Sequence, residues 1–533
     1  MVGKTGLARG IAVAPHAAAA QSAAAILGEG GNAIEAMVAA AATIAVVYPH
    51  MNGIGGDAFW LLHEPGRAPR AIDASGPAAA SLDAGFYRAR GLESIPMRGP
   101  LAANTVAGTV AGWELALQCS LSEWHGRMPL SRLLADAIGH ARDGIVVTRS
   151  QEASTAAKRA ELEGQPGFAS RFLPGGAVPR EGERFVQAPM AATLETLARS
   201  GLETFYRGEV ADSIASDLEA LGSPVKREDL AAYRAEWREP LRLGLPHGEL
   251  FNLPAPTQGV VSLLILAIAE RLGVDAMAPG SADHVHALVE ATKAAFVLRD
   301  RHVTDPRFMT LDAQSLLDAG RVESLARSID MARAMPWGGR TRPADTVWMG
   351  AIDAEGRGVS FIQSIYHEFG SGIVLAGTGI NWQNRGCSFS LDERALNVLR
   401  PGRKPFHTLN PALARLADGR LMVYGTMGGD GQPQTQAAVF TRHAWLGVGL
   451  QDSVSAPRWL LGRTWGSMSE TLKLESRFDA AVIDELTRRG HEVEVVGAYD
   501  EVVGHAGALV RHADGGLEGA FDPRSDGGVA VAR

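Results

Sequence analysis

The order of hydrophobic and polar positions predicts an alternation of strands and helices near the start of the chain. The apolar run 10–13 predicts a short strand, and the Ala-rich stretch 16–27 predicts a helix that ends at the glycines behind it. Asn32 with Glu35 three positions later is the signature of a capping box, so we expect a second Ala-rich helix to begin there. A strand is then expected over residues 58–63.

The middle of the chain has helical periodicity, and the last third has the periodicity of strands. Amphipathic patterns predict helices near residues 131–143, 191–200, 282–301 and 315–335. Four chain breakers between Pro336 and Pro343 predict an exposed linker. Two β-like runs, 347–352 and 359–365, follow it and predict a hairpin. Thr346 therefore stands where the linker meets a strand.

Size and charge exclude several classes of protein. The 533 residues and 56.2 kDa exceed what one hydrophobic core usually spans, so we expect two or more domains or one large layered fold. A formal charge of −8 and a pI near 6.0 give no basic surface of the kind that nucleic acids need, and no nucleic-acid partner is expected. The longest apolar run, 36–47, is shorter than the roughly 20 residues that cross a bilayer, so no membrane partner is expected either.

Cysteine and histidine usage gives no sign of a disulfide framework or a metal site. Cys119 and Cys387 have no CxxC companion, and both are expected to be free thiols in a reducing compartment, which predicts a cytoplasmic protein. The fifteen histidines form no HExxH pattern, and the glycines form no nucleotide-binding loop. We therefore expect no metal and no organic cofactor.

A threonine at the start of a strand usually has only a structural role, but several motifs follow Thr346 in a definite order. They are Phe369-Gly370-Ser371-Gly372, Asn384-Arg385-Gly386, Lys404-Pro405-Phe406-His407-Thr408 and Gly425-Thr426-Met427-Gly428-Gly429-Asp430. Together with the segments 53–57 and 289–296, this succession resembles the gamma-glutamyltranspeptidase family of N-terminal nucleophile hydrolases. The resemblance extends from about Gly10 to the end of the chain.

The resemblance implies an α+β fold, the four-layer αββα sandwich of the N-terminal nucleophile hydrolases. It also implies a proenzyme that cuts itself between Asp345 and Thr346. Residues 1–345 would then form a large subunit, and residues 346–533 a small subunit that stays associated with it.

The chemistry suits the residue types. Once cleavage frees the α-amine of Thr346, whose pKa is ordinarily about 7.7–8, this amine can take the proton of its own hydroxyl. Gly428 and Gly429 match the oxyanion hole of the family, although without this context they would simply form a turn. Ser364 matches a hydroxyl residue that steadies the nucleophile, and an ordinary strand serine is the alternative.

The residues that would recognise a γ-glutamyl group differ from the family pattern. Ser75 stands in the stretch where transpeptidases carry a carboxylate-binding arginine, and Ser388 stands where they carry an acid. His407 and Thr408 replace paired serines, and Tyr366 replaces an asparagine. Losing one charge-assisted contact typically costs about 1.5–3 kcal/mol, so a different acyl group is expected.

These departures favour an amidohydrolase that acts on a small non-glutamyl amide such as oxamate. The motifs around Asn384, Arg385 and His407 resemble the oxamate amidohydrolase and acylase-like branches of the family. Arg385 and His407 are expected to offer cationic contacts to a small carboxylate, and a surface or core role for Arg385 is the alternative. The full set of predicted substrate-binding residues is Ser75, Tyr366, Asn384, Arg385, His407 and Thr408.

Two other functions are compatible with the sequence. One is a glutathione hydrolase or γ-glutamyltransferase that recognises its substrate through relocated groups. The other is a non-catalytic binding or assembly module. The retention of Thr346, Gly428 and Gly429 disfavours the module.

Overall fold

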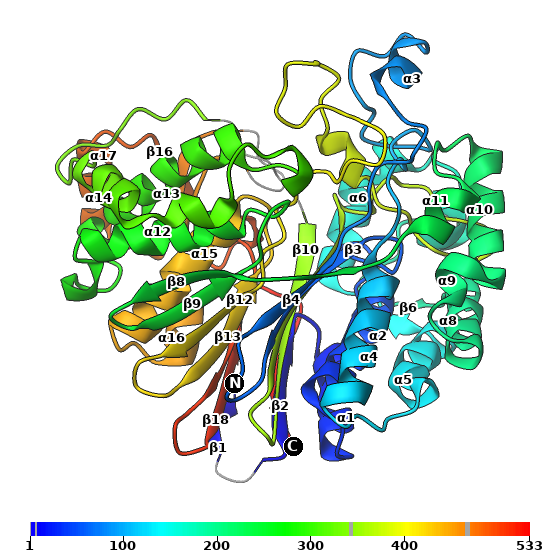
Figure 1. Cartoon of the computed structure of the whole chain (residues 1–533), viewed down its shortest axis with the longest axis horizontal. Helices are drawn as coiled ribbons and strands as arrows, with labels where there is room; N and C mark the ends of the chain where they lie inside the picture. Colours follow the sequence, from blue (N-terminus) through cyan, green and yellow to red (C-terminus); the bar gives the residue numbers. More distant parts are fainter. Residues whose placement is uncertain (1, 6–7, 340–344, 464–468) are drawn as a thin grey trace.

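The computed structural model describes residues 2–5, 8–339, 345–463 and 469–533. Two antiparallel sheets face each other, and helices cover the outer side of each, so the molecule has the four layers that the sequence predicts (Figure 1). The first sheet, in spatial order, contains β1 (Val2–Thr5), β18 (Leu517–Phe521), β17 (Ala506–Arg511), β13 (Leu421–Thr426), β12 (Ala412–Leu416), β9 (Gly248–Asn252) and β8 (Leu241–Leu245). The second contains β19 (Val529–Ala532), β2 (Gly10–Ala14), β10 (Asp345–Asp353), β11 (Gly358–Tyr366), β3 (Asp57–His63), β4 (Arg70–Ala74) and β7 (Glu236–Arg238).

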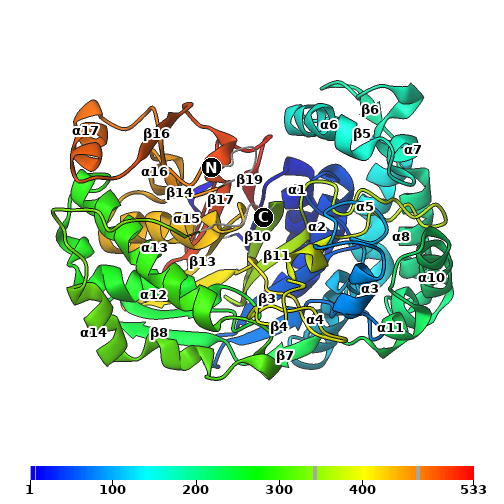
Figure 2. The same ribbon diagram turned by 90° about the horizontal axis from the view of Figure 1, so that it is seen from above.

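The helices fall into two groups, one on each side of the sandwich (Figure 2). Beside the second sheet lie α1 (Ala17–Gly28), α2 (Ala33–Val47), α4 (Thr109–Glu123), α5 (Leu130–Asp143), α8 (Ala188–Ser200), α9 (Thr204–Arg207), α10 (Glu209–Leu221) and α11 (Arg227–Ala232). Beside the first lie α12 (Gly259–Arg271), α13 (Ala282–His302), α14 (Ala319–Arg327), α15 (Gly431–Phe440), α16 (Leu450–Ser455) and α17 (Ala480–Arg488). A small sheet of β14 (Trp459–Leu461), β15 (Leu472–Glu475) and β16 (Val493–Val496) adjoins the second group. The remaining α-helices and strands are α3 (Ala84–Arg88), α6 (Arg149–Leu162), α7 (Phe168–Phe172), β5 (Ile145–Val146) and β6 (Arg184–Phe185).

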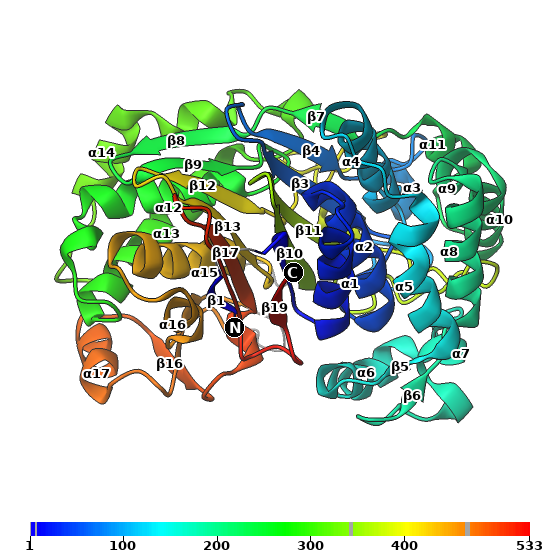
Figure 3. The same ribbon diagram turned by 90° about the horizontal axis from the view of Figure 1, so that it is seen from below.

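Both sheets combine strands from before and after Thr346 (Figure 3). β10 lies between β2 and β11, with Gly350 opposite both Val13 and Ser360. In the other sheet, β12 pairs with β9 on one side and β13 on the other. A chain cut before Thr346 would therefore remain joined by ladders of backbone hydrogen bonds and by the core between the sheets.

The space between the sheets is filled by one tightly packed apolar layer. Trp348 is 2% exposed, lies in this layer and donates its indole N–H to Ser360 Oγ at 2.9 Å. A Cβ placed on Gly425 of the facing sheet would lie 2.2 Å from the Trp348 ring. The absence of a side chain at Gly425 is thus what lets the two sheets close over the indole.

Several local predictions are confirmed. The capping box forms, because Glu35 N donates to Asn32 Oδ1 at 3.1 Å and Asn32 N donates to Glu35 Oε2 at 2.9 Å. The two Ala-rich helices, the strand after them and the hairpin of β10 and β11 are all present. Cys119 and Cys387 are free cysteines. Among the described residues, no helix combines the length and apolarity that a bilayer crossing requires.

The predicted helix over residues 315–335 is wrong in its second half. A 3-10 turn over Ala313–Leu317 precedes α14, which ends at Arg327. Beyond it, the backbone groups of Asp330, Ala334 and Met335 bond to residues outside this segment, and this competes with the local hydrogen bonds of a helix.

The predicted exposure of the following linker is confirmed at Pro336 and Gly338, whereas Trp337 is half-buried. Trp337 packs beside Phe296, with ring centroids 6.0 Å apart, because its large apolar ring gains more from burial than from solvation. The rest of the predicted linker, from residue 340 to Pro343, lies outside the described residues.

Crowding at Gly425 provides a test of the packing between the sheets. We expect Gly425→Ala to lower the free energy of unfolding by about 1–3 kcal/mol, because the methyl group must displace Trp348. Gly139→Ala in α5 is the control, since nothing lies within 4 Å of its Cβ and the change should stabilise the helix by up to about 1 kcal/mol. Thermal unfolding midpoints measure both effects. Equal midpoints for the two variants would contradict this account of the packing.

Candidate active site

The predicted catalytic residues gather at one end of the two sheets. β10 begins there with Asp345, which is the ladder partner of Tyr366 at the end of β11. Ser364 pairs with Asp57 at the start of β3. From the facing sheet, β13 ends at Thr426 and leads directly into the loop that carries the two predicted oxyanion glycines.

Thr346 is enclosed by the protein. Its side chain is buried, and its Oγ1 has no hydrogen-bond partner among the described residues. The ladder is irregular between Asp345 and Val347, so Thr346 sits at a bulge beside β11. Across from it, Ser364 Oγ accepts the backbone N–H of Tyr366 at 2.8 Å, where the backbone turns through a positive φ of 83°. Ser364 therefore fixes the turn that faces the threonine.

Gly428 and Gly429 adopt a backbone that only glycine tolerates well. Their φ angles are 114° and 54°, and the N–H groups of both have no acceptor among the described residues. α15 begins two residues later at Gly431, whose N–H bonds to the carbonyl of Gly428 at 2.7 Å. The positive end of this helix and two available N–H groups suit a site where negative charge develops on oxygen.

A buried polar scaffold holds this loop in place. Gln258 Nε2 donates to the carbonyl oxygens of Gly429 at 2.9 Å and Thr408 at 2.8 Å. Arg299 on α13 donates to Gln258 Oε1 at 3.1 Å and forms an ion pair with Asp430 at 2.9 Å. The sequence analysis did not assign roles to Gln258 and Arg299, since neither lies in a motif with a recognisable ligand pattern.

Arg385 is the most unusual residue of the site. It is 1% exposed, yet all three of its guanidinium nitrogens have no hydrogen-bond partner among the described residues. Its guanidinium carbon lies 3.8 Å from the centroid of the Tyr366 ring. Burial lowers the pKa of Arg385, but an arginine side chain remains charged. A buried cation with unused donors is the arrangement that binds an anion.

His407 does not provide the cationic contact that the sequence suggested. Burial and the neighbouring charge of Arg385 hold its pKa well below the usual value, so the imidazole is neutral. His407 Nε2 lies 3.3 Å from Asp57 Oδ2, and its ring contacts Phe59 edge-on. The expected positive charge is lost because a second cation beside buried Arg385 would have no solvent to screen it.

Asp57, at the start of β3, interacts with the charge of Arg385 and balances it only in part, because its own pKa is raised. Its Oδ1 accepts N–H groups from Gly76 at 2.9 Å, Gly108 at 3.1 Å and Gln383 Nε2 at 3.0 Å. Burial raises the pKa of Asp57 to about 7, although these hydrogen bonds and Arg385 oppose the shift. The sequence analysis used Asp57 only as part of a family motif and assigned it no charge-balancing role.

The other predicted binding residues fall into two groups. Thr408 Oγ1 is buried without a partner among the described residues, as a group that awaits a ligand would be. Asn384 and Ser75 are already used by the protein: Asn384 Nδ2 donates to the carbonyl of Met97 at 2.8 Å, and Ser75 Oγ donates to Asp73 Oδ1 at 2.5 Å. Asn384 and Ser75 therefore shape the walls of the site.

Asp73, in the stretch where the family pattern has an arginine, is paired with Lys404. Its Oδ2 accepts Lys404 Nζ at 2.7 Å, and this neighbour lowers the pKa of the carboxyl group. Both side chains are almost completely buried. The Lys404 charge is thus paired within the protein, whereas the donors of Arg385 have no acceptor in the described part of the chain.

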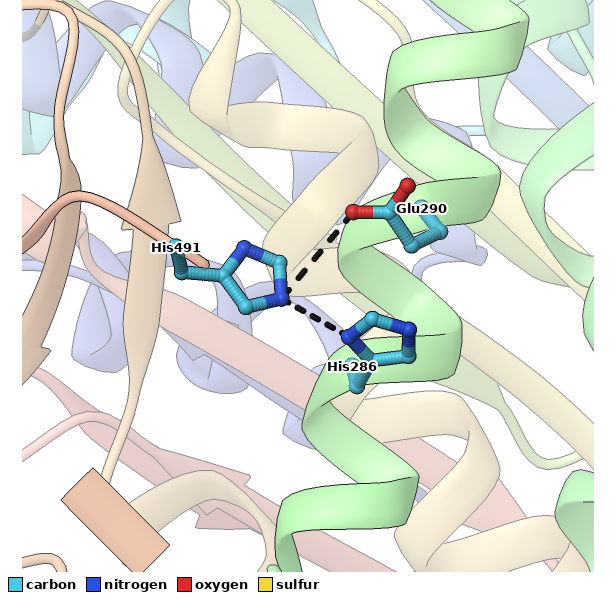
Figure 4. Close-up of side chains that lie close together, drawn as sticks. All are labelled: His286, Glu290 and His491. Atoms are coloured by element: carbon cyan, nitrogen blue, oxygen red, sulfur yellow. Dashed lines mark hydrogen bonds and ion pairs between the residues drawn. The ribbon is translucent and has the colours of Figure 1, made fainter. Parts of the chain in front are cut away.

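One group of three side chains in the described part of the chain could hold a metal ion, and it lies away from Thr346. His286, Glu290 and His491 form it on α13 and beyond α17 (Figure 4). Along α13, His286 is thirteen residues, or about 20 Å, from Arg299. Arg299 bonds to Gln258, which holds the loop of Gly428 and Gly429, so the group of three lies far from that loop.

The raised pKa of Asp57 predicts a pH-dependent stability. Because the native carboxyl holds its proton more tightly than the unfolded one, its contribution is complete below about pH 4 and is lost as the pH rises through about 7. Asp57→Asn should remove this dependence. The unfolding free energy of the parent minus that of the variant should therefore fall by at most about 1.4 kcal/mol per pH unit in this window. A difference that stays constant with pH would contradict the assignment.

Comparison with known proteins agrees with this geometry. The family model described as gamma-glutamyltranspeptidase matches residues 19–532. The chain is 59% identical over 522 residues to the oxamate amidohydrolase proenzyme of Klebsiella pneumoniae, covering 98% of each protein. It is 40% identical over 516 residues to the glutathione hydrolase-like YwrD proenzyme of Bacillus subtilis, covering 97% of each.

A solved structure gives the same result for the fold. The cephalosporin acylase of Bacillus halodurans superimposes with a TM-score of 0.90 at 33% identity, over 100% of this chain and 97% of the acylase. The predictions of an αββα sandwich and of an amide hydrolase are confirmed. The chain belongs to the gamma-glutamyltranspeptidase family.

Proposed function

We propose that this protein is a self-processing amidohydrolase with Thr346 as its nucleophile, and that its substrate is a small amide with a carboxylate next to the scissile carbonyl, such as oxamate. The observation that carries the proposal is Arg385, a buried cation whose donors find no acceptor among the described residues. Its guanidinium lies over the ring of Tyr366. Tyr366 is paired in the β-ladder with Asp345, the residue before Thr346. The 59% identity to an oxamate amidohydrolase proenzyme supports the same substrate.

Maturation would divide the chain between Asp345 and Thr346 into residues 1–345 and 346–533. The Thr346 nitrogen, an amide in the precursor, would become an amine that can accept a proton. The interleaved order of β2, β10 and β11 supports a stable pair of subunits, because neither part would have a complete sheet alone.

Catalysis would proceed by acyl transfer. The amine of Thr346 takes the proton of Oγ1, and the oxygen attacks the amide carbonyl of the substrate. The N–H groups of Gly428 and Gly429 stabilise the oxyanion, while Ser364 keeps the facing turn in position. Ammonia leaves with the proton from the amine, and an acyl ester remains on Thr346. Water then hydrolyses the ester and releases oxalate when oxamate is the substrate.

Substrate choice would depend on the buried charge of Arg385. The carboxylate of oxamate can accept the two parallel N–H groups of Arg385, with Thr408 Oγ1 and neutral His407 as further partners. A γ-glutamyl group also carries an ammonium, which needs an acidic side chain as its partner. The residue expected at that position is Ser388, which is not acidic. These contacts favour oxamate-like substrates over the alternative of glutathione hydrolysis or γ-glutamyl transfer.

The first prediction concerns maturation. Purified parent protein should give two bands on a denaturing gel, of about 36 and 20 kDa in proportion to 345 and 188 of 533 residues. Thr346→Ala should remain a single band without activity, because the attacking oxygen is gone. Thr346→Ser retains a hydroxyl and is the matched control, which should still be cleaved. An active, uncut Thr346→Ala protein would disprove the assignment of the nucleophile.

The second prediction concerns recognition of the carboxylate. Arg385→Gln should lower kcat/KM for oxamate by about 10- to 100-fold, the usual value of a charged hydrogen bond, and should change the hydrolysis of neutral oxamide much less. Arg442→Gln is the control, because Arg442 is equally buried but donates to the carbonyl of Pro457. It should reduce stability without selectivity between the two substrates. An equal loss for oxamate and oxamide in Arg385→Gln would contradict the proposal.

A further inference from the structure

The segment that follows α14, residues 328–339, is held along α13 before the chain reaches Asp345; we call it the tail segment. The carbonyl of Asp330 accepts His286 Nε2 at 3.0 Å, and Ala334 N donates to the carbonyl of Arg489 at 2.8 Å. The backbone N–H and carbonyl of Met335 are both bonded to side chains of α13. The tail segment is therefore fixed at three points within six residues.

Glu290 and Lys293 both bond to the backbone of one residue of the tail segment, Met335. Met335 N donates to Glu290 Oε2 at 3.0 Å, and Lys293 Nζ donates to the carbonyl of Met335 at 2.7 Å. The two side chains also pair with each other at 2.6 Å, with side-chain exposures of 5% for Lys293 and 0% for Glu290. Burying an ion pair is costly unless further hydrogen bonds use its remaining donors and acceptors. Here the backbone of Met335 provides those bonds.

The neighbouring histidines extend this anchor (Figure 4). Because His286 donates its Nε2 proton to Asp330, its Nδ1 accepts the proton of His491 Nε2 at 2.8 Å. Burial and the charge of Lys293 lower the pKa of His491 to about 3, so this is a hydrogen bond between neutral rings. The contacts join α13, the tail segment and the connection between α17 and β16.

The same group does not fit a metal centre well. Lys293 Nζ already occupies Glu290 Oε1, and an ammonium beside a metal ligand repels a cation. The histidine nitrogens stand 2.8 Å apart, whereas two ligands about 2.0–2.1 Å from a tetrahedral zinc would stand farther apart. The hydrogen bonds to the tail segment account for the cluster without an ion.

Apolar contacts secure the end of the tail segment. Met331, Met335 and Trp337 pack against the core of the outer helical layer, and the Trp337 ring faces Phe296. Trp337 lies nine residues before Thr346, which limits the connecting chain to about 30 Å at full extension. The anchor therefore limits how far from the cleavage point the chain before it can begin.

We propose that Glu290 and Lys293 are positioning residues for self-cleavage: by holding Met335, they direct the chain so that the peptide bond between Asp345 and Thr346 is presented for hydrolysis. The inference rests on the self-processing in the proposed function. The step consumes one water and leaves a carboxylate on Asp345 and an amine on Thr346. Misplacement of a reacting bond by about 1 Å can cost about 100-fold in rate, so loss of the grip should slow cleavage strongly.

Met335→Pro tests the grip without a change in α13. Proline has no N–H, so the bond to Glu290 Oε2 cannot form. Cell-free translation, followed by denaturing gels over time, measures the cleavage rate of the full chain. We expect cleavage about 10- to 100-fold slower than in the parent. The kcat and KM for oxamate of the fraction that does become cut should equal those of the parent, a result that general misfolding would not give.

Glu290→Met together with Lys293→Met provides the complementary test. This double variant removes both charges at once, so no unpaired ion is left in the core, and besides the ion pair itself only the two bonds to Met335 are lost. Cleavage should again be slow while the unfolding midpoint stays near that of the parent. Glu35→Gln is the matched control: Glu35 is a buried acid that accepts backbone N–H groups from Asn32 and Met128 far from the tail segment, and its loss should not slow cleavage.

The outcomes separate this inference from the proposed function. Cleavage at the parental rate in both Met335→Pro and the double variant would overturn the positioning role and leave the nucleophile assignment intact. Slow cleavage in Glu35→Gln equal to that of the double variant would also overturn it, because the effect would then follow from instability alone. Cleavage of Thr346→Ala would instead refute self-processing by Thr346.

Discussion

The position of β10 between β2 and β11 is the constraint on which the rest of the structure depends. Its residues bond to the strands on both sides. The side chain of Trp348 packs against the facing sheet at Gly425, where the absence of a side chain leaves room for the indole. A strand held in this way cannot move when the chain before it is cut. The residue at its start, Thr346, is thereby fixed at the end of the sandwich where β13 delivers Gly428 and Gly429.

The charges of the site follow from the same enclosure. Because the site is buried, the guanidinium of Arg385 finds no hydrogen-bond acceptor among the described residues, while Lys404 is paired with Asp73 and His407 stays uncharged. Asp57 interacts electrostatically with Arg385, and its Oδ1 is held by three N–H donors. Under the proposed function, the charge of Arg385 would then serve a substrate with one carboxylate better than a zwitterion.

The sequence allowed much of the fold to be predicted, and it singled out residues that the structure brings together at the candidate site. Capping at Asn32, the hairpin after Thr346 and the order of the motifs depend on local patterns, and these were correct. The charge of His407 could not be predicted from the sequence. Its pKa depends on burial and on Arg385, and only the fold brings the two side chains together. The helix predicted to reach Met335 failed for a similar reason: the partners that hold the tail segment, Glu290 and Lys293, are side chains of another helix.

The most direct test of the account is to identify the residue that carries the acyl group during turnover. Rapid mixing of cleaved enzyme with oxamate, acid quenching and peptide mass spectrometry would locate the intermediate. The account predicts an oxalyl ester on the peptide that begins at Thr346, formed and lost at rates consistent with turnover. An oxalyl group on another residue, or a mature small subunit that begins at a different residue, would contradict it.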